Sequence, residues 1–146
     1  MKRTLSIAGA VLLVTATSWG LAADPHSLRG IMQELGRQMG TLTQAIMADD
    51  RETIVAAAAA IADHPQPPLS ERIRILGSLG TAAPAFRQAD KDVHDAAIAV
   101  KQAAEAGDRD ALAAGFHRLT RSCLACHTRF RNEDIKALTR PAEPGH

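Results

Sequence analysis

The chain has 146 residues and a formal charge of +1, from 17 basic and 16 acidic residues, which suits a single domain and excludes the strongly basic surface of a nucleic-acid-binding protein. Hydrophobic residues make up 46% of the chain, but aromatic residues only 3%. Alanine, the strongest helix former, occurs 29 times. The composition therefore predicts an all-helical protein.

The first 22 residues have the three-part layout of a secretory signal peptide. Two basic residues precede an apolar run that ends at Val14, and small residues follow, so that cleavage after Ala22 or Ala23 fits the pattern. Polar residues after Val14 leave the run too short to cross a bilayer. We therefore expect residues 1–22 to be a cleaved signal peptide and residues 23–146 to form one periplasmic domain, without membrane insertion.

Two amphipathic helices are predicted before the proline-rich stretch at residues 64–68. Apolar residues recur at three- and four-residue steps over residues 28–46, which is typical of one buried helix face. Asp49 or Asp50 can cap the second helix, which must end before the prolines.

Two further helices are predicted after a short helical turn at residues 70–76, which we expect Gly77 and Gly80 to break. The third helix covers residues 84–107, and the fourth begins after an N-cap at Asp108 and is closed by Pro141. Four such segments are most simply combined in an antiparallel four-helix bundle. The many alanines either bring the helices close together or leave space for a large apolar cofactor.

The run from Cys123 to His127 reads C-x-x-C-H, the attachment pattern of a c-type haem. On a helix, these positions can address one haem from the same side. Cys123 and Cys126 would form the thioethers, and His127 would coordinate the iron. A thioredoxin-like dithiol needs a βαβ context, and a zinc site needs more ligands, so we predict one covalent haem c.

The chain resembles the class II c-type cytochromes related to cytochrome c-prime. The resemblance lies in the C-terminal motif from Cys123 to Arg131, which follows Gly107, Asp108 and Phe116, and in the stretch at residues 31–39. It implies a four-helix bundle with covalent haem c in an exported and often dimeric protein. High-spin members of the family have an open or blocked distal side, whereas low-spin members bind iron through a methionine of the first helix.

Met32 is the candidate for this second iron ligand. Met32 followed by Gly36 resembles the pattern of the low-spin members. Met39 lies on nearly the same helix face, and either methionine can instead be an ordinary core residue. We predict His127 as the proximal ligand and Met32 as the distal ligand.

Iron held by two protein ligands has no vacant site for a substrate, which predicts a non-enzymatic electron carrier that exchanges electrons with redox partner proteins. Axial methionine favours the ferrous state. The alternative is a five-coordinate cytochrome c-prime that binds nitric oxide or carbon monoxide, and a haem peroxidase is a third, less favoured function. A haem with two histidine ligands is also less favoured, and His64 lies beside prolines.

Four arginines surround the C-x-x-C-H motif. They can pair with haem propionates, offer a docking face to a partner, or be solvated surface charges. These residues are Arg118, Arg121, Arg129 and Arg131.

Overall fold

The computed structural model describes residues 24–131, and within this range the chain is all-helical, with no strand. The expected signal peptide lies outside the described residues. None of the described helices is long and apolar enough to cross a membrane. The helices are α1 (Leu28–Ala48), α2 (Arg51–Ala62), α3 (Leu69–Leu79), α4 (Ala83–Ala106) and α5 (Arg109–Phe130), with a short 3-10 turn, η1 (Gly80–Ala82), before α4.

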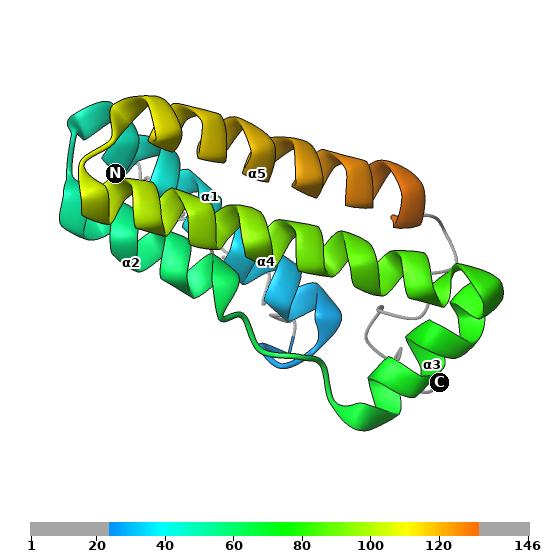
Figure 1. Cartoon of the computed structure of the whole chain (residues 1–146). Coiled ribbons are helices and arrows are strands. Elements are labelled where there is room, and N and C mark those ends of the chain that lie inside the picture. Colours follow the sequence, from blue (N-terminus) through cyan, green and yellow to red (C-terminus); the bar gives the residue numbers. More distant parts are fainter. Residues whose placement is uncertain (1–23, 132–146) are drawn as a thin grey trace, which may run out of the picture.

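The helices α1, α2, α4 and α5 run up and down beside one another as the predicted four-helix bundle (Figure 1). In this bundle α1 packs along α2, α2 along α4, and α4 along α5. The short helix α3 lies in the connection between α2 and α4, at one end of the bundle. Because of the up-and-down order, the start of α1 and the end of α5 meet at that same end.

Side-chain caps explain where several of these helices begin. The carboxylate of Asp50 accepts a hydrogen bond from the backbone N–H of Thr53, and Asp108 accepts one from Ala111. Asp50 is thus the cap of α2, whereas Asp49 ends α1 in a left-handed conformation with φ of 56°. The predicted starts of both helices are confirmed.

One of the two glycines expected to break α3 does so, and the predicted end of α5 is wrong. α3 continues through Gly77 and ends at Leu79, with Gly80 as its cap. α5 ends at Phe130 rather than at Pro141, which lies outside the described residues. Glycine inside a helix costs only about 1 kcal/mol, whereas burying an isoleucine such as Ile75 contributes about 1.5–3 kcal/mol. Packing of the helix against its neighbours therefore outweighs the one glycine.

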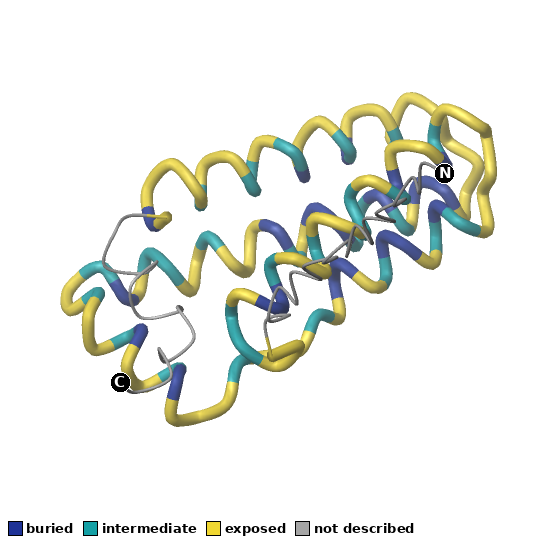
Figure 2. The backbone as a smooth tube through the Cα atoms, turned by 180° about the vertical axis from the view of Figure 1, so that it is seen from behind, coloured by how far each residue is buried: buried dark blue, intermediate teal, exposed yellow. Residues whose placement is uncertain are grey.

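The core lies along the middle of the bundle, where buried residues of neighbouring helices meet (Figure 2). Its fully buried large side chains include Leu42, Ile61, Val100 and Leu119, and alanines fill much of the rest. Close approach of α4 and α5 depends on Gly115, because a Cβ there would lie 3.2 Å from Val100 Cγ2 and 3.3 Å from the Val100 backbone nitrogen. Small residues thus allow the helices to pack tightly in this region.

A matched pair of glycine-to-alanine substitutions tests this packing. Gly40 of α1 is exposed, with no atom within 4 Å of a Cβ placed there. Because alanine is the better helix former, Gly40→Ala should raise the free energy of unfolding by about 0.5–1 kcal/mol. Gly115→Ala should lower it by about 1 kcal/mol or more, because the added methyl overpacks the contact with Val100. Urea unfolding followed by circular dichroism measures both, and equal stabilisation by the two changes would contradict the close packing.

Candidate functional site

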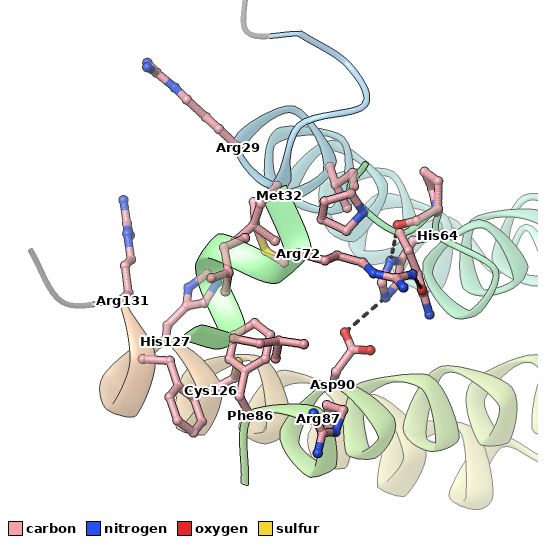
Figure 3. A pocket seen from close by; sticks show the side chains of 18 of the residues that line it. Arg29, Met32, His64, Arg72, Phe86, Arg87, Asp90, Cys126, His127 and Arg131 are labelled. Atoms are coloured by element: carbon pink, nitrogen blue, oxygen red, sulfur yellow. Dashed lines mark hydrogen bonds and ion pairs between the residues drawn. The ribbon is translucent and has the colours of Figure 1, made fainter. Parts of the chain in front are cut away.

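A cavity of about 770 Å³ lies at the end of the bundle beside α3 (Figure 3). This volume is within the usual range for small-molecule and cofactor sites. Its walls come from α1, α3, α4, α5 and the connection after α2. The large apolar side chains that line it are Leu28, Ile31, Ile75, Leu76, Phe86 and Phe130, and the arginines are Arg29, Arg72, Arg87 and Arg131. An apolar interior with arginines among its lining residues fits a ligand that has an apolar body and anionic groups, as haem does.

Three of the four residues predicted for haem binding line this cavity. Met32 extends from the beginning of α1, while Cys126 and His127 lie in the last turns of α5. Cys123 does not line the cavity; it lies one turn earlier on α5, half-buried, and packs against the hydrophobic core. Residues from opposite ends of the described sequence therefore meet at one site.

The three methionines within residues 24–131 have different environments. Met32 is partly buried and lines the cavity. Met39 packs against the core cluster, as an ordinary core methionine does, and Met47 is 77% exposed. Of these three residues, Met32 is the one that faces the same space as His127.

The two cysteines are free, half-buried thiols. Burial raises the pKa of Cys123, and burial together with the nearby Asp90 carboxylate raises the pKa of Cys126. Redox-active dithiols instead have a lowered pKa, because the thiolate is the reactive form. The environment of these cysteines thus differs from that of a thioredoxin-like site.

Within residues 24–131, no group of three or more His, Cys, Asp or Glu side chains could hold a metal ion. Iron in a haem requires fewer protein ligands, because the porphyrin supplies its four nitrogens and the protein only the axial groups. His127 and Met32 are an imidazole and a thioether, which are both known axial donors. The residues at this cavity therefore fit a haem.

A histidine and an aspartate on different elements meet at the cavity wall, and the sequence pattern gave no sign of their pairing. His64 Nε2 lies 3.3 Å from Asp90 Oδ1, and His64 Nδ1 lies 3.0 Å from the carbonyl oxygen of Pro65. Because both neighbours are acceptors, both ring nitrogens are best satisfied as donors, which is the imidazolium form. The hydrogen bond to Asp90 raises the pKa of His64, although partial burial opposes the shift.

Helix α3 is held against the start of α1 by Glu71, which is buried although it is acidic. The backbone N–H of Leu28 donates to both carboxylate oxygens, at 3.3 and 3.4 Å. The partial positive charge of a helix N-terminus favours a carboxylate in this position. This contact holds α3, and with it the cavity-lining residues Arg72 and Ile75, against the rest of the bundle.

The arginines predicted to surround the haem motif divide between two surfaces. Arg131 lines the cavity, together with arginines from α1, α3 and α4. The other three, Arg118, Arg121 and Arg129, line a separate groove between α4 and α5. The sequence could not separate these sets, because the division depends on which helix packs beside α5.

A helical bundle in which Cys126 and His127 of a C-x-x-C-H motif line a largely apolar cavity has features of a c-type haem protein. The family model described as Cytochrome C' matches residues 79–131, which include α4, α5 and the whole motif. No curated protein and no solved structure matches the chain. The match supports the resemblance to the cytochrome c-prime family, whereas α1 with Met32 lies outside the matched residues.

The pairing of His64 with Asp90 predicts a pH-dependent contribution to stability. Because the pKa of His64 in the folded chain is raised above its ordinary 6.5, this contribution is fully present below that pH and is lost as the pH rises through the folded-state pKa. Asp90→Asn should therefore flatten the decline in the free energy of unfolding of the holoprotein as the pH rises above the ordinary histidine pKa of 6.5.

Asp92→Asn is the matched control for this measurement, because Asp92 is an exposed carboxylate on the same helix whose partner is Gln88. Urea unfolding at several pH values should give the same pH dependence for this control as for the wild-type protein. The interpretation of His64 is wrong if Asp90→Asn leaves the pH dependence unchanged.

Proposed function

We propose that this protein is a periplasmic, non-enzymatic electron carrier with one covalently attached haem c, bound through Cys123 and Cys126. The observation that carries the proposal is that Met32 and His127 line one cavity from α1 and α5. The family match at residues 79–131 supports haem c as the cofactor. Electron transfer rather than gas binding is favoured because the Met32 thioether lines the same cavity as the His127 imidazole.

The haem, when bound, would supply a one-electron couple between ferric and ferrous iron. His127 would hold the iron on one side as a neutral imidazole, and Met32 would hold it on the other side through its sulfur atom. The arginines at the cavity suit the two propionates. If His127 and Met32 both held the iron, a substrate or gas molecule would have to displace one of these side chains.

The bundle itself would keep the two side chains that hold the haem in place. Met32 belongs to α1 and His127 to α5, and both helices are held by the packed core around α2 and α4. Rigid support of this kind means that little rearrangement accompanies a change of oxidation state. Small rearrangement is what an electron carrier requires.

Apolar side chains would shield part of the cofactor from water. Phe86 and Phe130 meet edge to face, with ring centroids 5.3 Å apart, and Ile31 and Ile75 are almost fully buried beside the same cavity. A low-polarity environment disfavours the extra positive charge of ferric iron. Together with axial methionine, it favours the ferrous state.

The assignment of Met32 is tested with Met32→Ala and the matched control Met39→Ala. The wild-type holoprotein should have a low-spin spectrum with the ferric methionine-to-iron band, and the ferrous form should bind carbon monoxide slowly. Met32→Ala should lose the band and bind carbon monoxide rapidly, because one axial position becomes open. Met39→Ala should keep the wild-type spectrum, because Met39 packs in the core.

Two results would contradict this proposal in different ways. Rapid carbon monoxide binding by the wild-type protein, with a high-spin spectrum, would replace the electron carrier with the five-coordinate gas-binding alternative. Loss of the band in Met39→Ala but not in Met32→Ala would move the ligand to Met39. Stopped-flow absorption spectroscopy makes both measurements on the same samples.

A further inference from the structure

A second hollow lies on the outer surface of the bundle, lined only by residues of α4 and α5. This α4–α5 groove has a volume of about 570 Å³. Cys126 and Phe130 line both the groove and the inner cavity. The groove is therefore the outer side of the wall that carries one of the two haem-attachment cysteines.

The α5 side of the groove is basic. Arg118, Arg121 and Arg129 line it and are exposed, and α5 contains no acidic residue after Asp110. Among the described residues, none of these three arginines forms an ion pair within 4 Å. Within residues 24–131, no carboxylate therefore neutralises these guanidinium groups, although that of Arg129 lies over the Phe130 ring, 5.1 Å from its centroid.

The α4 side offers little acidic charge to balance these arginines. Asp92 lines the groove, and its carboxylate accepts a hydrogen bond from the Gln88 side chain at 2.9 Å. Asp95 lies close enough to Arg118 for the arginine to help lower its pKa, but its main partner is Lys91. The groove keeps an excess of positive charge.

An exposed apolar residue lies outside the groove, on the side of α5 next to Arg121. Leu124, between the two cysteines, is 61% exposed, and Arg121 and Thr128 lie one turn away from it on α5. Protein interfaces commonly combine a large apolar side chain with a surrounding polar rim. Four large apolar residues of the described chain are strongly exposed: Met47, Leu69, Ile73 and Leu124. Of these four, Leu124 alone lies within the C-x-x-C-H motif.

We propose that the α4–α5 groove, with Leu124 beside it, is the docking surface for an acidic, carboxylate-rich face of a redox partner protein. The inference rests on the proposed electron-transfer function. Complementary charge would steer the partner to this face, and Leu124 would be covered on contact. Docking here brings the partner's redox centre against the wall that carries Cys126, which shortens the path for the electron.

Binding is tested first without electron transfer, using amide NMR spectra of the full-length ferrous holoprotein and poly-L-glutamate as the acidic probe. Shift changes should concentrate at residues 117–129 and should weaken with added salt, because screening acts on exposed charges. Changes concentrated at the arginines of the inner cavity, or spread evenly over the surface, would overturn the proposal. So would the absence of any change.

The kinetic test uses Arg121→Glu, with Arg51→Glu as the control. Arg51 is also exposed and without an ion pair among the described residues, but it lies at the start of α2, at the far end of the bundle. At low salt, Arg121→Glu should slow oxidation of the ferrous holoprotein by the hexacyanoferrate(III) anion about tenfold. Arg51→Glu changes the net charge equally and should have little effect.

A cationic oxidant, cobalt(III) tris-phenanthroline, should give the opposite response to Arg121→Glu. Equal effects of the two substitutions would mean that only net charge matters and would overturn the proposal. Self-association that is lost in Arg121→Glu, measured by sedimentation, would assign the groove to a second copy of the chain and overturn it as well. If the protein is low-spin but its oxidation rates do not change in Arg121→Glu, this docking surface alone is rejected. If the wild-type protein binds carbon monoxide rapidly, the proposed function is rejected.

Discussion

The up-and-down packing of the bundle is the constraint on which the candidate site depends. Met32 and His127 are far apart in the sequence, and they face one cavity only because α1 starts and α5 ends at the same end of the bundle. That geometry requires α4 and α5 to pack closely, which Gly115 allows by leaving room for Val100. Small residues in the middle of the bundle and larger apolar residues around its end together produce a tight core and an open cavity.

The arginines around this site lie on two surfaces, one suited to hold a cofactor and the other suited to bind a partner protein. Arg72 and Arg131 are among the arginines that line the cavity, whereas Arg118, Arg121 and Arg129 line the outer groove. The two surfaces share a wall that includes Cys126 and Phe130. A haem held inside would therefore lie just behind the surface that an acidic protein is expected to approach.

Much of the fold could be predicted from local signals. The caps at Asp50 and Asp108 and the helix periodicity identified the bundle helices, since these signals act within one or two turns. The end of α5 could not be predicted in this way. The helix stops at Phe130, where that side chain is buried, while the nearest downstream proline, Pro141, is well beyond it.

Contacts between distant segments were also beyond the sequence pattern. The His64 pair with Asp90 and the Glu71 contact with Leu28 each join different elements, and neither has a characteristic spacing. By contrast, the C-x-x-C-H residues were identifiable from a known attachment pattern, and Met32 from the resemblance of Met32 and Gly36 to the pattern of the low-spin family members. What the sequence alone left open was which methionine shares a space with His127, because that depends on how the helices pack.

The most direct test of the account is X-ray absorption at the iron edge of the purified ferric holoprotein. Ligation by both His127 and Met32 predicts six iron neighbours, with one sulfur from Met32 in addition to the four porphyrin nitrogens and the nitrogen of His127. Iron with five nitrogen neighbours and no sulfur, or with six nitrogen or oxygen neighbours, would contradict axial ligation by methionine.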